Sequence, residues 1–265
     1  MICAGVDAGS RMLKIVLVDD GTLAVTASGV LDEGIDQDAL AVQLLERLLA
    51  EGGLRRQDVR AVVATGYGRK LIGMADAAIT EVTCQAWGVR RRVPDARTII
   101  DIGGQDSKLV RLKPDGAVSD FAMNDRCAAG TGRFLEVLAT RLGVKLAHLG
   151  ELVQRSRKPA TISNMCVVFA ETEIIGLLAS GTLPEDIVAG VQGSIATRVA
   201  AMAGRNLTEP IIFTGGVAMV PGMEAALQSA LGKPVLLAPD PQMTCALGAA
   251  ILAAHRVRGR HPPAC

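Results

Sequence analysis

The feature that most constrains the fold of this chain is a motif that occurs twice. Residues 7–14 are Asp-Ala-Gly-Ser-Arg-Met-Leu-Lys and residues 101–108 are Asp-Ile-Gly-Gly-Gln-Asp-Ser-Lys, so aspartate, glycine and lysine recur at the same spacing. Each copy is followed further along by a matching strand end, Val-Val-Ala-Thr-Gly at 62–66 and Ile-Ile-Phe-Thr-Gly at 211–215. Because the order of the two motifs also repeats, we interpret the chain as an internal duplication.

The hydrophobic pattern predicts an α/β fold, because short strand-like runs alternate with segments of helical period. The expected strands are residues 2–7, 13–19, 23–30, 59–65, 98–101 and 108–112, with Asp-Gly turns at Asp20 and Asp115. The expected helices are residues 39–51, with Asp36 as N-cap, and residues 81–93, ended by Pro94. A further helix-like stretch covers residues 146–154 and contains His148.

Composition excludes several classes of function. The formal net charge is +1 and only 2% of the residues are aromatic, so neither nucleic acid nor an anionic membrane is an expected partner. Charged residues or glycine interrupt every apolar run before it reaches the length of a membrane helix, and no leader pattern is recognisable, so we expect a cytoplasmic protein. With only three histidines, a Ser-His-Asp triad or a His-rich metal site is not expected either.

The two Gly-rich turns suggest a phosphate-binding role. Successive backbone N–H groups at such a turn bind anions, and an aspartate at the strand end can hold hydrated Mg²⁺ or orient a water molecule. Either turn alone is more often an ordinary hairpin tip. Two in register across a pseudo-dyad predict a clamp with one turn on each side of a phosphate, and a third Gly-rich strand end lies at 214–217. Neither a Walker A motif nor G-x-G-x-x-G is present.

This two-fold phosphate clamp resembles the superfamily of ATPases that includes actin, hexokinase and the heat-shock chaperones. The resemblance implies a duplicated ribonuclease-H-like fold of class α/β. The expected first ATPase domain spans residues 1–95, joined by a C-terminal helix at 244–256. The second spans residues 96–243 with a cluster-binding insertion, because the second copy is longer than the first between its Asp motif and its Thr-Gly and this extra length contains Cys127 and Cys166. For residues 257–265 we expect a disordered tail.

The cysteines depart from the default of buried, reduced thiols. The six are widely spaced and form no C-x-x-C motif. Cys127 and Cys166 each lie where a loop enters an apolar helical run, and a helix N-terminus lowers the pKa of a thiol. One chain thus offers two thiolates, whereas a cubane cluster needs four ligands. A symmetric dimer would supply them, although a lone cysteine is more often structural.

Long motifs identify the chain as a member of the family of ATP-dependent activators (component A) of 2-hydroxyacyl-CoA dehydratases and the ATPase subunits of benzoyl-CoA reductase. The resembling segments are 65–69, 101–106, 127–134, 166–171, 214–217 and 246–250. The resemblance implies a homodimer that bridges one 4Fe-4S cluster through Cys127 and Cys166 of both subunits. It also implies ATP with Mg²⁺, ferredoxin or flavodoxin as electron donor, and a dehydratase or related reductase as acceptor. Two residues depart from the family pattern: Arg11 replaces a small hydroxyl residue, and Cys245 replaces a common glycine.

On this basis Asp7 and Asp101 are the expected catalytic residues, which hold Mg²⁺ and position water. The expected nucleotide contacts are Gly9, Ser10, Lys14, Gly103, Gly104 and Gln105 at the phosphates and Gly215, Gly216 and Gln242 toward the nucleoside. Lys14 and Lys108 would neutralise phosphate, but an ordinary solvated strand lysine is favoured for each. Glu171 is either an acid near the nucleotide or a partner in a helix-surface salt bridge.

Three alternatives remain open. The chain could be the ATPase subunit of a benzoyl-CoA reductase or of a double-cubane reductase, because the motifs do not name the partner. A small-molecule kinase of the same fold would need a base aimed at a substrate hydroxyl and would have no use for two helix-start cysteines. A polymerising actin-like scaffold would need heterologous contacts, whereas a shared cluster requires a closed dimer.

Overall fold

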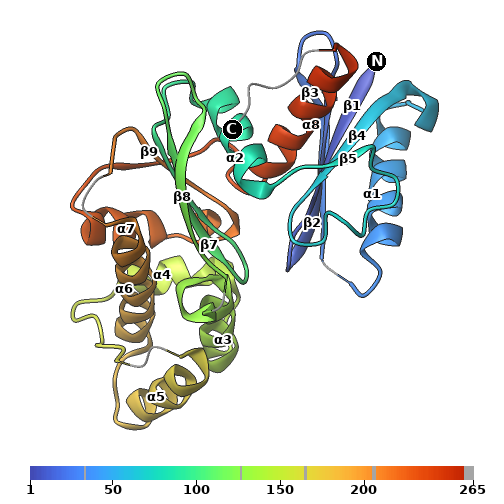
Figure 1. Cartoon of the computed structure of the whole chain (residues 1–265). Helices are drawn as coiled ribbons and strands as arrows, with labels where there is room; N and C mark the ends of the chain where they lie inside the picture. The colour runs from blue at the N-terminus through green and yellow to red at the C-terminus, as the bar shows by residue number, and fades with distance from the viewer. Residues whose placement is uncertain (33, 126, 164–165, 205–206, 260–265) are drawn as a thin grey trace. The chain divides into compact units, whose positions relative to one another are not determined.

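The computed structural model describes residues 1–32, 34–125, 127–163, 166–204 and 207–259 (Figure 1). The chain divides into two compact units. Unit 1 comprises Met1–Arg97, Val110–Asp120 and Ala238–Cys265, and unit 2 comprises Thr98–Leu109 and Phe121–Leu237. The domain boundaries expected from the sequence stay predictions, and most of the expected tail, residues 260–265, lies outside the described residues.

The first sheet has five strands in the order β3-β2-β1-β4-β5. These are β1 (Ile2–Ala8), β2 (Met12–Asp19), β3 (Val25–Asp32), β4 (Val59–Thr65) and β5 (Ala77–Ala78). β1 pairs antiparallel with β2 and parallel with β4. The helices of unit 1 are α1 (Gln37–Glu51), α2 (Glu81–Arg92) and α8 (Thr244–Val257), with a short 3-10 helix, η1, at Arg56–Asp58.

The second sheet repeats this strand order as β8-β7-β6-β9-β10. These are β6 (Thr98–Ile102), β7 (Ser107–Leu112), β8 (Val118–Asn124), β9 (Ile211–Thr214) and β10 (Val235–Leu237). The α-helices of unit 2 are α3 (Gly132–Leu142), α4 (Leu149–Val153), α5 (Val167–Ala179), α6 (Pro184–Ala203) and α7 (Met223–Leu231). Three 3-10 helices accompany them, η2 (Ala128–Gly130), η3 (Leu146–His148) and η4 (Gly216–Met219).

The expected duplication is confirmed in the strand registers. Asp7 lies beside Thr65 on the parallel neighbour of β1, and Asp101 lies beside Thr214 on the parallel neighbour of β6. The two copies differ in what connects the third strand to the fourth. In unit 1 that connection contains the helix α1 and the short η1, whereas in unit 2 its described residues form η2, α3, η3, α4, α5 and α6.

Unit 1 is a three-layer structure because both faces of its central strands are apolar. Alternate residues of β1 pack against α1 on one face, where Leu44 and Leu48 join the core. The opposite face packs against α8, which is buried along almost its whole length. α8 and α2 approach closely at two glycines, since a Cβ atom on Gly88 would lie 1.7 Å from Thr244 O and one on Gly248 the same distance from Cys84 O.

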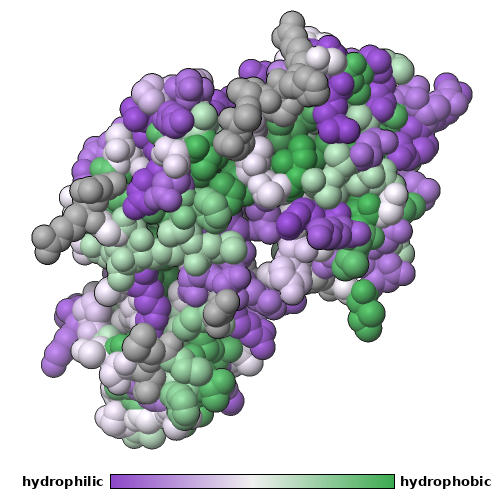
Figure 2. Space-filling view, in the orientation of Figure 1, coloured by the Kyte–Doolittle hydropathy of each residue, from purple (hydrophilic) through white to green (hydrophobic). Residues whose placement is uncertain are grey.

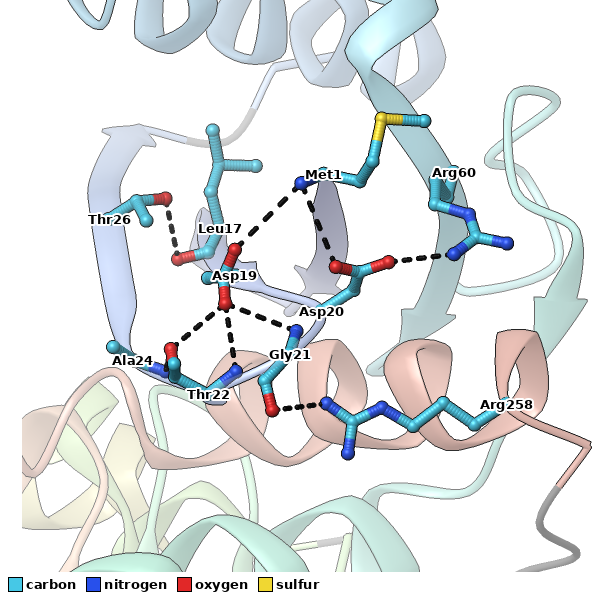
Figure 3. Close-up of polar contacts among 10 residues, drawn as sticks. All are labelled: Met1, Leu17, Asp19, Asp20, Gly21, Thr22, Ala24, Thr26, Arg60 and Arg258. Atoms are coloured by element: carbon cyan, nitrogen blue, oxygen red, sulfur yellow. Dashed lines mark hydrogen bonds and ion pairs between the residues drawn. The ribbon is translucent and has the colours of Figure 1, made fainter.

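A group of polar contacts surrounds the turn between β2 and β3 at one end of the first sheet (Figure 3). Asp19 Oδ1 accepts hydrogen bonds from the amides of Gly21 and Thr22, and Arg60 donates to Asp20 at 2.9 Å. Arg258, which follows α8, donates to Gly21 O at 2.5 Å and so joins the end of that helix to the turn. The predicted Asp-Gly turn at Asp20 is therefore confirmed.

Local signals set most element ends. Asp36 caps α1, because its Oδ1 accepts from Ala39 N at 3.0 Å as expected. The third strand begins at Val25 and not at residue 23, since Leu23 has a positive φ of 59° and its amide donates to Asp19 O as part of the turn. The helix-like stretch at 146–154 is η3 followed by the single-turn α4.

One apolar core fills unit 2 between its sheet and helices. It joins Ile100 and Phe213 from the sheet to Phe134 of α3, Ile195 of α6 and Leu227 of α7. α5 contributes little to this core, because only Ala170 and Ile174 of its thirteen residues are buried. Among the helices of the described residues, none is long and apolar enough to cross a membrane.

Candidate nucleotide and cluster site

The first Gly-rich turn connects β1 to β2 and is closed by an ion pair. Asp7 and Lys14 lie opposite each other in the antiparallel ladder, and Lys14 Nζ is 2.9 Å from Asp7 Oδ2. The Gly9 amide donates to Met12 O at 3.2 Å, which closes the turn. Because that amide is used, amides further along the turn, beginning with Ser10, are better placed to bind an anion.

The second turn has the same construction with one more carboxylate. The Gly103 amide donates to Asp106 O at 2.9 Å, as Gly9 does to Met12. Lys108 Nζ is 2.5 Å from Asp106 Oδ2 and 3.7 Å from Asp101 Oδ2. The lysine therefore serves two carboxylates, and the nearer one is Asp106. Gly104 and Gln105 form the tip between them.

The favoured expectation for the two lysines, solvated strand residues, is wrong. Only 14% of the Lys14 side chain and 5% of the Lys108 side chain are exposed. Lysine is rarely buried to this extent unless it is paired, and here each pairs with the motif aspartates of its own turn. Whether either lysine also meets a phosphate stays a prediction.

Each motif aspartate lies against a glycine whose backbone has a positive φ, in the left-handed region. Gly66 follows β4 with φ +90°, and Gly215 follows β9 with φ +91°. A Cβ atom on Gly66 would lie 2.6 Å from Asp7 Oδ1, and one on Gly215 would lie 2.4 Å from Asp101 Oδ1. A side chain at either position would collide with the carboxylate and with the neighbouring backbone, so glycine leaves the room that the aspartate occupies.

The described cysteines fall into two groups by exposure. Cys3, Cys84 and Cys245 are buried, whereas Cys127 is half-buried and Cys166 is exposed. Desolvation is the main cause that raises the pKa of the Cys3 thiol, and it raises that of Cys84 to about 12. Such thiols are inert at neutral pH, because the thiolate is the reactive form.

The two accessible cysteines both precede helical segments of unit 2, as expected. Cys166 is the N-cap residue of α5. Cys127 precedes the three-residue helix η2, and α3 begins only at Gly132. For Cys127 the helix start is therefore a single 3-10 turn and not the apolar helix itself.

Similarity to known proteins now decides the family. A model of the BadF/BadG/BcrA/BcrD ATPase family matches residues 4–253. The chain belongs to this family. The activator of lactoyl-CoA dehydratase from Anaerotignum propionicum is 42% identical over 96% of this chain and 97% of its own length. A benzoyl-CoA reductase subunit from Thauera aromatica is 30% identical over 96% of this chain and 94% of its own.

Solved structures also match the fold of this chain. The activator of 2-hydroxyisocaproyl-CoA dehydratase from Clostridium difficile, solved with bound ADPNP, has a TM-score of 0.93 and 39% identity, covering 98% of this chain and 96% of that one. A ROK hexokinase from Thermus thermophilus reaches a TM-score of 0.55 at 14% identity, covering 98% of this chain and all (100%) of that one, which shows the fold alone. The predicted two-domain α/β fold of duplicated ribonuclease-H-like type is confirmed, and ATP is the nucleotide implied by the family.

The remaining predicted site residues lie in several elements. Gly216 opens η4 after Gly215, and Gln242 is half-buried in the turn before α8. Arg11 is exposed at the first turn, and Cys245 Sγ is 4.0 Å from Thr65 Oγ1. Glu171 forms an ion pair with Arg141, so of its two interpretations the helix-surface salt bridge is confirmed.

Three residues that support the site were not singled out from the sequence. Gln37, the buried first residue of α1, donates from Nε2 to Gly9 O at 3.4 Å. Asp106 pairs with Lys108, and Asn124 bonds to the backbone of Cys127. Asp106 and Asn124 lie in or beside the recognisable motifs, but their roles depend on turn geometry. Gln37 carried no local signal, because its partner is far away in the sequence.

Proposed function

We propose that this ATPase-family protein is a homodimeric iron–sulfur activator that uses ATP hydrolysis to drive single-electron transfer. The electron comes from ferredoxin or flavodoxin and passes at low potential to a 2-hydroxyacyl-CoA dehydratase-type partner. The observation that carries this proposal is the exposure of the cysteines. On a fold whose family hydrolyses ATP, Cys127 and Cys166 are the accessible thiols among the described cysteines.

These two cysteines fit the ligands of an iron–sulfur cluster. Accessible thiolates are the usual ligands of such clusters, and a 4Fe-4S cluster takes four. Among the described residues, no three His, Cys, Asp or Glu side chains come together to hold a metal ion within one chain. Two thiols from each of two chains would complete the set, and a cluster held there would store one electron at low potential.

The surface of α5 supports the homodimer. Next to the exposed Cys166, Val168 is 68% exposed and Phe169 66% exposed, and Ile175 is also exposed on the same helix. Figure 2 shows hydrophobic colour gathered over the part of unit 2 where α5 lies in Figure 1. Exposed apolar helix residues mark interaction sites, and a second copy would cover them and bring its own Cys166 close.

For the nucleotide we propose that both Gly-rich turns bind phosphate through their backbone amides. Asp7 and Asp101 would hold hydrated Mg²⁺ and orient the attacking water, while Gly215, Gly216 and Gln242 would lie toward the nucleoside. Lys14 and Lys108 keep the carboxylates of their turns in place and reduce their negative charge beside phosphate.

The second candidate is the ATPase subunit of a benzoyl-CoA reductase, and the 30% identity to a subunit of such an enzyme favours it. The higher identity to the dehydratase activator makes the dehydratase partner the preferred proposal. A double-cubane reductase would use the same ATPase chemistry. A small-molecule kinase or a polymerising scaffold gives no reason for two accessible helix-start thiols.

The test is the iron and acid-labile sulfide content of anaerobically purified protein. We expect a brown dimer with about four irons per dimer. Cys127→Ser and Cys166→Ser should each lose the cluster, whereas Cys3→Ser, which changes a buried thiol, is the matched control and should keep it. A wild-type protein that is colourless and monomeric after reconstitution, or full iron occupancy in either serine variant, would contradict the proposal.

A further inference from the structure

We infer that residues 127–133 form a stiff connector that transmits the state of the second phosphate turn to the Cys127 thiol, with Asn124 as the positioning residue for Cys127. This inference rests on the proposed function for the meaning of Cys127 and of the turn. The connection itself consists of hydrogen bonds within unit 2.

At one end, the connector is bonded to the phosphate turn. The amides of Gly132 and Arg133, the first two residues of α3, donate to Gly103 O at 2.9 Å and to Gly104 O at 2.8 Å. A Cβ atom on Gly132 would lie 3.2 Å from Gly103 O and 3.1 Å from Val217 Cγ2. The start of α3 therefore lies directly against the turn, and a shift of residues 103–104 must move it.

At the other end, Asn124 holds the backbone of Cys127 on both sides. Its Nδ2 donates to Cys127 O at 3.0 Å, and its Oδ1 accepts from Cys127 N at 3.2 Å. Asn124 is the last residue of β8, so this pair of bonds fixes the cysteine relative to the sheet. An aspartate could accept the Cys127 amide but could not donate to its carbonyl.

Between these ends the chain has little freedom. Thr131 Oγ1 and Thr131 N both bond to Ala128 O, at 2.7 Å and 3.1 Å. Ala129, Gly130 and Thr131 are buried. A Cβ atom on Gly130 would lie 3.2 Å from Asn124 Nδ2, so the middle of the connector packs on the residue that positions Cys127. Because the segment is short and closely packed, we expect a displacement at the turn to reach Cys127.

Cys166 provides an internal comparison. The Cys166 carbonyl accepts a hydrogen bond from Ala170 N of the helix that it caps, α5, and Cys166 itself is exposed. Among the backbone hydrogen bonds of the described residues, none joins Cys166 to the phosphate turn. We therefore expect nucleotide to alter the surroundings of Cys127 more than those of Cys166.

The test measures alkylation of metal-free, fully reduced, full-length protein by iodoacetamide, read at each cysteine by peptide mass spectrometry. Rates are compared without nucleotide, with Mg-ADP and with Mg-ADPNP, after calorimetry has confirmed that each nucleotide binds. In the wild type, the Cys127 rate should differ between ADP and ADPNP by at least threefold, and the Cys166 rate should differ less.

Asn124→Ala should raise the alkylation rate of Cys127 without nucleotide. It should also remove at least two thirds of the difference in Cys127 rate between bound ADP and bound ADPNP. The Kd for ADP should stay within twofold of the wild-type value. Asn124→Asp, which keeps the acceptor for the Cys127 amide, should retain an intermediate response. Asp120→Ala, on the same strand and exposed, is the matched control and should behave as the wild type.

A Cys127 rate that is equal in the two bound nucleotides, or a full response in a folded Asn124→Ala protein, overturns the inference. If the alanine variant does not fold, the wild-type comparison of Cys127 with Cys166 decides. The readout needs no cluster, so failure of iron to bind would contradict the proposed function without affecting this result, and the reverse also holds.

Discussion

The two motif aspartates differ in how far a lysine neutralises them. Asp7 has Lys14 at 2.9 Å, whereas Asp101 is 3.7 Å from Lys108, which lies nearer to Asp106. Lys108 is shared between Asp101 and Asp106, and Asp101 is the more distant of these two carboxylates, whereas the Lys14–Asp7 pair is a direct contact across the first hairpin. We expect both aspartates to contribute to hydrolysis, and Asp7 also to hold the structure of its turn through Lys14.

Asp101→Asn should lower kcat for ATP hydrolysis by at least tenfold, or about 1.4 kcal/mol in the barrier, while the cluster is retained, because this aspartate acts at the nucleotide and not at iron. Asp7→Asn should lower kcat as well. Steady-state ATPase assays, with the visible spectrum as a check on the cluster, measure both. Equal turnover in wild type and a folded, coloured Asp101→Asn protein would mean that the second turn has been misinterpreted.

Some residues of the candidate site could be predicted from the sequence, and others could not. The motif aspartates, the glycines after them and Thr-Gly could be predicted because their spacing repeats. The burial of Lys14 and Lys108 could not, since it depends on cross-strand pairing and on what covers the hairpin. Likewise, the role of Asn124 depends on a turn that brings its side chain back onto Cys127.

At the scale of elements, the loop before α5 is attached to α6 by one carboxylate. Asp186 Oδ1 accepts from Ser156 Oγ at 2.7 Å and from the amides of Arg157 and Lys158 at 3.0 Å each. The Lys158 amide bond is the leading cause that holds the pKa of Asp186 below its ordinary value. Gly190, one turn further along α6, allows Ala160 to lie directly on the helix.

This depressed pKa predicts a pH dependence of stability. Asp186 has a lower pKa in the folded than in the unfolded protein, so its contribution is present above the unfolded value of about 3.9 and is lost as pH falls through the folded value. Asp186→Asn should lower the Tm at pH 6, and its difference from wild type should shrink toward pH 3. Thermal unfolding at several pH values measures this. Asp95→Asn, at an exposed site, is the control, and a difference that is constant with pH would contradict the account.

Elements were predictable where local signals define their ends. Asp36 and Pro94 mark helix ends, and β4 matches its expected bounds because a continuous apolar run ends in Thr-Gly. The helices α3 to α6 were predictable only in part. α5 is apolar on nearly all sides but buries few residues, so its sequence does not show which face packs within its own chain.

At the scale of the whole molecule, the duplication accounts for the fold. Two sheets with the same strand order place an aspartate, a glycine turn and a Thr-Gly strand end in the same relation in each unit. The long connection between β8 and β9 is where the copies diverge, and it contains both accessible cysteines. The sequence located this insertion by comparing the copies, but the connector from the turn to Cys127 became visible only with the hydrogen bonds.

The central claim is that nucleotide bound to the duplicated ATPase fold controls a cluster held by Cys127 and Cys166. If the Cys127 segment moves with the phosphate turn, access to the cluster must depend on which nucleotide is bound. The most direct measurement is the rate at which an iron chelator removes iron from the anaerobic dimer with bound Mg-ADP and with bound Mg-ADPNP. The account predicts rates that differ by at least threefold and a smaller difference in Asn124→Ala. Equal rates in the wild type, with both nucleotides shown to be bound, would contradict it.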